Sequence, residues 1–481
     1  MSKTYDLILR GATVIDGTRA PRFEADVAVE GDRIAAIGSL SSFKSRKEIN
    51  AEGKIVSPGF IDAHTHDDRL MLSAPEMAPK ISQGVTTVVA GNCGVSLAPL
   101  NLGSKAVPSP LDLMGGPEWF HYSNFKSYVQ ELEENPAATN AALLVGHTTL
   151  RIATMTNVER PASPGEISRM KSLVSEALDA GAIGCSTGLY YEPARAAPTE
   201  EVIEVCRPLA ARKALYCTHM RDEGDKVIES LEETFRIGRE LGVPVVVSHH
   251  KVVGTPNHGR SRETLPLIAE RMASQSIGLD CYPYCASSTI LTADRAALAT
   301  KTLVTWSTPH PEVAGMELKD IARKFGLSEK ETADRLRPAG GIYFMMDEAD
   351  VQRVLAFEQT MIGSDGLPHD AAPHPRLWGT FPRVLGHYAR GLGLFPLETA
   401  VYKMTGLPAK TFGLDDRGVV KEGAYADLCI FDAGAVDEAA TFAKPIQAAK
   451  GIEAVAVNGR LVWHNGKPTG ARPGKVLSRT P

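Results

Sequence analysis

Two histidines one residue apart follow a short apolar segment near the beginning of the chain. The segment 55–61 leads into Asp62-Ala63-His64-Thr65-His66. Residues i and i+2 of a strand point to the same face, so His64 and His66 can aim two imidazoles, common ligands of divalent metals, at one point. Two exposed strand histidines are the alternative. However, a strand that is apolar on both faces is typical of a buried parallel strand, whose carboxyl end carries the chemistry of α/β proteins. The pair therefore indicates a metal site.

Other side chains that can bind a metal follow later apolar segments. Taken singly, each has an ordinary structural explanation, because a cysteine after a strand is often a small buried hydrophobe and an aspartate before glycine is often a turn residue. In a closed barrel, however, all strand ends face one rim, so these side chains converge. Cysteine and histidine favour zinc over magnesium or calcium, and the set suffices for one or two metals. The candidate ligands are His64, His66, Cys93, His219, His249 and Asp365.

The middle of the chain alternates between strand-like and helix-like patterns. Helical patterns such as 167–180 and 225–241 lie between short apolar segments. This alternation predicts an α/β fold, a (β/α)₈ TIM barrel over residues 58–414. Besides the segment before His64, the predicted strands are 86–90, 141–145, 182–185, 214–218, 243–247, 277–280 and 360–363.

Both ends of the chain have a different texture, with short apolar runs separated by Asp-Gly and Asn-Gly turns. Such dipeptides between apolar runs indicate hairpins. We expect residues 1–57 and 415–481 to pair into one small β-sandwich domain, since chain termini are often close in space. Residues 286–345 separate the last two barrel strands and include a charged helical piece, 318–336. We interpret them as an inserted, lid-like subdomain, because structureless loops of that length are rare.

The composition of the chain argues against several classes of protein. The chain has 481 residues, 43% of them hydrophobic, and a formal net charge of −5, so no basic face for nucleic acid or an anionic membrane is implied. We find no apolar run long enough to span a membrane and no signal peptide. Seven cysteines, an odd number, argue against a disulfide framework. We therefore expect a cytoplasmic protein with a small-molecule substrate. The sequence leaves its oligomeric state open.

The chain resembles the amidohydrolase superfamily in the stretch Phe60–His66, in the histidines after the fifth and sixth strands and in Asp365. Its strand-end motifs resemble more narrowly the D-aminoacylase group, the N-acyl-D-amino-acid deacylases. Many binuclear members of the superfamily have a carboxylated lysine after strand four, but 182–191 contains no lysine. Cys93 resembles the cysteine that replaces it in D-aminoacylases. The narrower motifs are 91–94, 218–221, 248–251 and 362–366.

The resemblance implies a metal-dependent hydrolase of the amide bond of N-acyl-D-amino acids. A tightly bound zinc is expected on Cys93, His219 and His249, and a weaker second metal position on His64, His66 and Asp365. Zinc activates water near neutral pH, and Asp365 would accept a proton from that water and deliver it to the leaving amine. Cys185, Cys217 and Cys281 are expected in the core, and His250 either contacts substrate or supports a ligand.

The substrate implied by the resemblance carries an α-carboxylate, which an arginine fork holds well. Arg376 matches the group's motif for this role, and Lys251, Tyr191, Tyr282 and Ser288 lie in other strand-end loops. Arg295 lies near the start of the insertion. If it points into the pocket beside Lys251, it can hold a second carboxylate, which favours N-acyl-D-glutamate over hydrophobic substrates. The alternative is a surface arginine paired with Asp294.

Two other functions compete with this interpretation. A cyclic amide hydrolase, such as a dihydroorotase or hydantoinase, shares the barrel and the His-x-His pair, but the absent lysine and Asn92-Cys93-Gly94 argue against it. A non-catalytic scaffold on the same fold would be expected to have lost ligands, and all six are present.

Overall fold

Eight short parallel strands form a nearly closed barrel in the middle of the chain, in a computed structural model that describes residues 4–480. The strand residues are buried, as expected when helices cover a parallel sheet. Between the first and last strands, Ala63 N–H donates to Ile362 O (3.1 Å) and Asp365 N–H to His64 O (2.8 Å). The predicted TIM barrel is confirmed. Its strands, in order around the barrel, are β6 (Phe60–Asp62), β7 (Val85–Ala90), β10 (Asn140–Gly146), β11 (Gly184–Gly188), β12 (Leu215–His219), β13 (Val245–Val247), β14 (Ile277–Cys281) and β18 (Thr360–Ile362).

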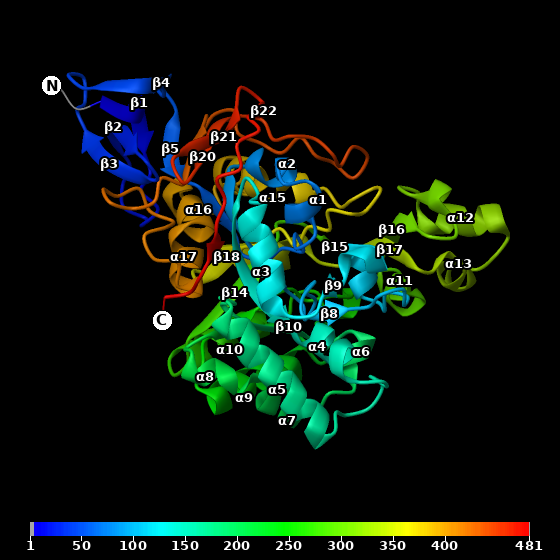
Figure 1. Cartoon of the computed structure of the whole chain (residues 1–481). Coiled ribbons are helices and arrows are strands. Elements are labelled where there is room, and N and C mark those ends of the chain that lie inside the picture. The colour runs from blue at the N-terminus through cyan, green and yellow to red at the C-terminus, as the bar shows by residue number, and fades with distance from the viewer. Residues whose placement is uncertain (1–3, 481) are drawn as a thin grey trace.

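Amphipathic helices connect these strands and cover the barrel (Figure 1). α5 begins with a capping box, in which Ser163 and Glu166 satisfy each other's backbone N–H groups. α9 buries residues spaced three and four apart and ends at Gly242, whose φ of 66° suits a residue without Cβ. The main outer helices are α3 (Phe125–Glu134), α4 (His147–Thr154), α5 (Pro164–Asp179), α7 (Thr199–Cys206), α9 (Val227–Leu241), α10 (Ser261–Met272), α14 (Glu348–Ala356), α15 (Arg376–Arg383), α16 (Leu397–Met404) and α17 (Gly406–Phe412).

The two ends of the chain form one β domain, as predicted. They join where β5 (Ile55–Pro58) pairs antiparallel with β19 (Leu428–Phe431), within a nine-stranded sheet. Strands from both ends contribute to one apolar cluster, and they lie side by side in Figure 1, blue against red. The other strands are β1 (Thr4–Val14), β2 (Phe23–Glu30), β3 (Arg33–Gly38), β4 (Lys44–Asn50), β20 (Ile452–Val457), β21 (Arg460–His464) and β22 (Lys467–Pro468).

The segment between β14 and β18 builds a small three-stranded antiparallel sheet with its own apolar cluster. It lies on the side of the barrel away from the β domain (Figure 1). The helical piece predicted over 318–336 is two helices, because Gly326 adopts a left-handed φ of 67° and Ser328 caps a new helix. The elements are β15 (Ala286–Ile290), α11 (Ala293–Leu298), β16 (Lys301–Ser307), α12 (Leu318–Phe325), α13 (Glu329–Leu336) and β17 (Ala339–Phe344).

Among residues 4–480, no helix combines the length and the apolar character needed to cross a lipid bilayer.

Phe60 packs where the barrel meets the β domain, and it provides a test of this architecture. Its ring stacks on Phe381 of α15 at 5.7 Å between centroids and lies 6.3 Å from the ring of Phe431 in β19. We expect Phe60→Ala to lower the free energy of unfolding by about 3–5 kcal/mol, because a fully buried ring leaves a cavity. Phe23→Ala, at a ring that is 41% exposed, should change it by less than about 1 kcal/mol. Urea unfolding measures both, and equal losses would contradict this packing role.

Candidate active site

Three of the predicted site residues adopt an uncommon backbone conformation directly after a barrel strand. Cys93, His249 and Asp365 have φ values of 53°, 36° and 50°. Residues other than glycine rarely adopt this left-handed region, and the strain concentrates at functional sites, where the surrounding structure enforces it. At all three positions the chain turns sharply at the carboxyl end of a strand, which places the side chain at the mouth of the barrel.

The six predicted ligands converge at this mouth. Cys93 Sγ lies 3.3 Å from His64 Nε2 and 3.2 Å from His249 Nε2. Asp365 Oδ1 lies 3.2 Å from His66 Nε2 and 3.6 Å from His64 Nε2. The ring of the sixth, His219, lies 4.4 Å from the His249 ring. None of the six is more than 7% exposed.

The side chains fall into three overlapping groups whose ligand atoms lie within 4.8 Å of one another. One of them, His64, His66 and Asp365, consists of the same residues as the second metal position expected from the sequence. The first expected position differs in detail, because Cys93 and His249 group with His64, whereas His219 groups with His249 and Glu223. His249 therefore belongs to two groups, and so does His64.

The electrostatics of these groups fit a soft divalent metal. Both ring nitrogens of His219 are buried without a hydrogen-bond partner. Burial lowers the pKa of His219 well below its ordinary value, which keeps the imidazole in the neutral form that binds metals. Burial also raises the pKa of the Cys93 thiol, and a bound cation reverses this effect by stabilising the thiolate. Sulfur and imidazole donors together suit zinc.

Glu223 was not among the predicted site residues, although it lies four residues after His219. Its Oε1 accepts a hydrogen bond from Lys251 Nζ (2.6 Å) and lies 3.1 Å from His249 Nδ1. Burial raises the pKa of Glu223, but the charge of Lys251 and the nearby histidines outweigh burial and hold the pKa well below its usual range. Glu223 therefore orients the His249 imidazole as a carboxylate behind a metal-binding histidine does. In the sequence, only the position of Glu223 in the loop after a predicted strand could have indicated that it belongs to the site.

Asp280, at the end of β14, supports the other side of the cluster. Its Oδ1 accepts a hydrogen bond from the backbone N–H of His249 (2.9 Å) and lies 3.5 Å from His64 Nδ1. In the sequence, Asp280 is only the last residue of the predicted strand 277–280. In the structure, Asp280 holds the backbone of His249 by a hydrogen bond and faces the ring of His64.

Asp365 is paired with an arginine. Arg376 Nη1 lies 2.9 Å from Asp365 Oδ2, and Arg376 Nη2 donates to Ser288 O (3.0 Å). Burial raises the pKa of Asp365, but Arg376 and the hydrogen bond with His66 prevail and hold it well below its usual range. Arg376 is fully buried and does not line the cavity described next. The structure thus places it behind Asp365.

A cavity opens over the ligand cluster, and it brings together most of the predicted substrate-binding residues. Arg295 lines it, is only 5% exposed and lies 3.9 Å from Glu223 Oε2. The alternative interpretation, a surface arginine, is therefore wrong. Leu113, Thr289 and Leu367 also line the cavity and were not predicted. The predicted residues along its wall are Tyr191, Lys251, Tyr282, Ser288 and Arg295.

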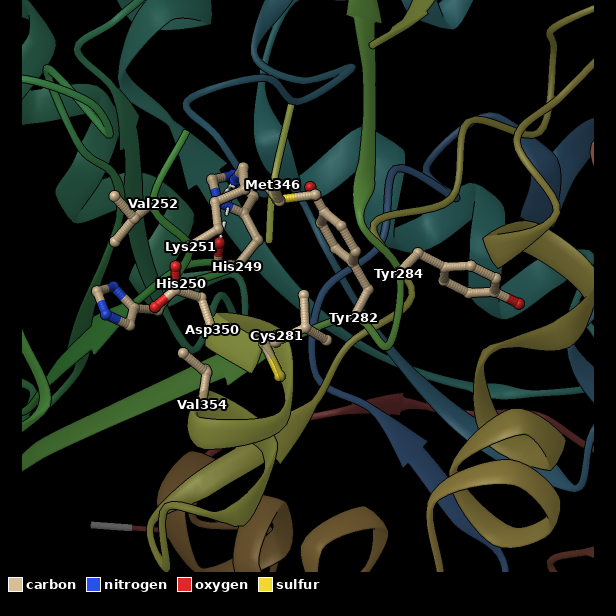
Figure 2. Close-up of a pocket in the computed structure, with 11 residues that line it drawn as sticks. His249, His250, Lys251, Val252, Cys281, Tyr282, Tyr284, Met346, Asp350 and Val354 are labelled. Carbon is tan, nitrogen blue, oxygen red and sulfur yellow. Dashed lines mark hydrogen bonds between the residues drawn. The ribbon is translucent and has the colours of Figure 1, made fainter. Parts of the chain in front are cut away.

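A second, mainly apolar cavity lies behind His249, Lys251 and Tyr282, which line both cavities. Figure 2 shows Lys251 hydrogen-bonded beside His249, whereas His250 points away from them. His250 Nε2 lies 2.9 Å from Thr264 Oγ1, so His250 supports the strand-end loop and does not face the ligand cluster. Three cysteines expected in the core are buried: Cys185, Cys217 and Cys281.

Comparisons with known proteins agree with this geometry. The model of the amidohydrolase family matches residues 47–300 and 328–466. Three proteins of Alcaligenes xylosoxydans xylosoxydans match almost end to end. A D-aminoacylase is 57% identical over 100% of this chain and 99% of its own length. An N-acyl-D-aspartate deacylase is 52% identical (98% and 95%), and an N-acyl-D-glutamate deacylase is 46% identical (100% and 98%).

Solved structures give the same result. A crystal structure of D-aminoacylase superposes with a TM-score of 0.97 at 58% identity and covers 99% of this chain and 100% of its own. The N-acyl-D-glutamate deacylase of Bordetella bronchiseptica, solved with zinc and a phosphonate mimic of the tetrahedral intermediate, superposes with a TM-score of 0.95 at 45% identity, with the same coverage. The resemblance inferred from the strand-end motifs is thereby confirmed: the chain belongs to the amidohydrolase family and, within it, to the D-aminoacylase group.

Proposed function

We propose that this protein is a zinc-dependent hydrolase of N-acyl-D-amino acids that prefers N-acyl-D-glutamate. The observation that carries the proposal is the convergence of Cys93, four histidines and Asp365 beneath a cavity that is lined by cations. The D-configuration of the substrate is supported by the names of the relatives, all of which act on D-amino acid derivatives.

Zinc held by these ligands supplies Lewis-acid chemistry, which makes water a better nucleophile near neutral pH and polarises the amide carbonyl. We assign the proton transfers to Asp365. Its pairing with Arg376 keeps it ionised and therefore able to accept a proton from the attacking water. The same carboxyl then gives that proton to the departing amine, which leaves poorly without it.

The cations around Tyr282 suit the α-carboxylate of the substrate. Lys251 Nζ lies 5.6 Å from the centre of the Tyr282 ring, and the Arg376 guanidinium lies 4.6 Å from it. We propose that Lys251 and Tyr282 hold the α-carboxylate on this side, whereas Arg376, which was predicted for this role, lies behind Asp365 and does not reach the cavity. Tyr191, whose hydroxyl lies 3.0 Å from Thr289 Oγ1, and Ser288 also line the cavity.

Arg295 supports the acidic preference. Its guanidinium lies 5.1 Å from the ring centre of Tyr190 and 5.5 Å from that of Tyr343, and its Nη2 lies 3.4 Å from Ser287 Oγ. The contact with Glu223, 3.9 Å, is long for an ion pair. A buried guanidinium with so little anionic contact suits a second substrate carboxylate.

A substrate panel tests the function. We expect zinc-loaded protein to hydrolyse N-acetyl-D-glutamate faster than N-acetyl-D-aspartate, N-acetyl-D-leucine or N-acetyl-L-glutamate, measured as free amine released. Faster turnover of the leucine derivative would support the proposed deacylase activity but overturn the proposed preference for an acidic side chain. Turnover of hydantoin alone would indicate a cyclic amide hydrolase, and bound zinc without any hydrolysis would indicate a scaffold.

Asp365→Asn tests the acid–base role. We expect kcat to fall about 10²–10⁴-fold, because an amide can neither accept nor return the proton. Asp370→Asn is the matched control, since Asp370 is also only 7% exposed and burial raises its pKa to about 7, so an uncharged group is already tolerated there. An unchanged kcat in Asp365→Asn would show that Asp365 does not carry out the proton transfers.

Arg295→Met tests the specificity. We expect kcat/KM for N-acetyl-D-glutamate to fall roughly 10- to 100-fold through loss of a charged hydrogen bond, and that for N-acetyl-D-leucine to be retained. Arg195→Met is the control, because Arg195 also contacts the Tyr190 ring (5.9 Å) but does not line the cavity. An equal loss on both substrates would show that Arg295 does not select the side chain.

A further inference from the structure

Lys80 is fully buried, although it belongs to the short helix α2 (Ala78–Ile81) outside the barrel strands. Its Nζ donates hydrogen bonds to Asp62 Oδ2 and to Ser364 Oγ, both at 2.8 Å, and lies 3.3 Å from Asp67 Oδ2. All four side chains have zero solvent exposure. A lysine is almost never buried to this extent without paired partners. Here the partners come from the two ends of the barrel sequence.

Each partner of Lys80 adjoins a candidate metal ligand. Asp62 Oδ1 accepts the backbone N–H of Ser364 (2.7 Å) and, more weakly, that of His64 (3.4 Å). Ser364 Oγ accepts the N–H of Gly366 at 3.2 Å. The Lys80 ammonium therefore fixes the backbone on both sides of Asp365 and the backbone of His64.

The location matters because β6 and β18, the first and last strands, meet here. The two strands are not neighbours in the hydrogen-bonded order of the barrel sheet. They are joined by the two backbone hydrogen bonds at Ala63 and Asp365 and by a single bridge between Thr65 and Gly366. His64, His66 and Asp365 all lie along this weakly paired junction, so their spacing depends on what crosses it.

We propose that Lys80 is a positioning residue that sets the spacing of the His64, His66 and Asp365 metal position. The ammonium is compact and offers three donors, which matches the three oxygens around it. Without it, the buried carboxylates of Asp62 and Asp67 lose their shared counter-charge, and Asp62 is held against Ser364 by the Ser364 N–H alone. The expected effect of Lys80 on turnover rests on the proposed function, whereas its expected effect on metal binding does not.

Lys80→Met tests this role, with Lys403→Met as the matched control. Lys403 is also buried (1% exposed) and also contacts β18, but its Nζ donates to the backbone carbonyls of Phe357, Glu358 and Thr360 at the opposite end of that strand. Both variants remove a buried ammonium and should lower the melting temperature of the metal-free protein. Only Lys80→Met should alter the metal position.

The readouts are the number of Co²⁺ ions bound in a titration, followed by visible absorption, and the kinetic constants of the zinc enzyme. We expect Lys80→Met to weaken the second cobalt position about 10- to 100-fold, as for residues that support metal ligands, and to lower kcat with KM retained. Lys403→Met should keep the cobalt titration, kcat and KM of the unchanged protein. Ser364→Ala removes the two hydrogen bonds of the Ser364 hydroxyl, to Lys80 and to the Gly366 N–H, and no charge. It should show a smaller loss at the same position, and it tests the inference if Lys80→Met does not fold.

An unchanged cobalt titration in folded Lys80→Met, or in Ser364→Ala if Lys80→Met does not fold, would overturn the inference, as would an equal effect of Lys403→Met. If the unchanged protein hydrolyses no N-acyl-D-amino acid, the proposed function fails. The cobalt titration still decides the role of Lys80 in that case.

Discussion

The site depends on burying several carboxylates at the mouth of one barrel, because an unpaired buried charge is costly. Each of three acidic clusters has its own buried cation. Arg376 pairs with Asp365, Lys251 pairs with Glu223, and Lys80 lies between Asp62 and Asp67. Arg376 and Lys251 help to hold the pKa values of Asp365 and Glu223 well below their usual range where water is excluded, and the pairs hold the surrounding imidazoles and thiol in place.

This pairing also divides the cations near the cavity by function. Lys251 and Arg376 are within 3 Å of a protein carboxylate oxygen, 2.6 Å and 2.9 Å respectively. Arg295 has a longer contact with Glu223, 3.9 Å, and its guanidinium lies near the rings of Tyr190 and Tyr343. A substrate carboxylate that binds Arg295 therefore has the weakest existing contact with a protein carboxylate to replace. The acidic preference that we propose rests on this difference and not on overall similarity, since identity is higher to the D-aminoacylase than to the N-acyl-D-glutamate deacylase.

The weakest part of the barrel coincides with half of the ligands. Where β6 meets β18, few backbone hydrogen bonds hold the strands together, and Asp365 adopts a left-handed φ of 50°. A backbone under strain keeps its conformation only when side chains around it enforce that conformation. The buried hydrogen bonds of Asp62 and Lys80 provide that enforcement from outside the metal cluster.

The sequence by itself determined the barrel, the β domain shared by both chain ends and the convergence of His64, His66, Cys93, His219, His249 and Asp365. It could do so because strand periodicity is local, and because parallel strands in a closed barrel must place their carboxyl ends on one rim. Only the tertiary structure decided which ligands group together, that Arg376 lies behind Asp365, and that Glu223 and Lys80 belong to the site. Those contacts join distant segments: Lys80 and Ser364 are 284 residues apart. No local pattern marks such a pair, since its geometry exists only once the two ends of the barrel meet.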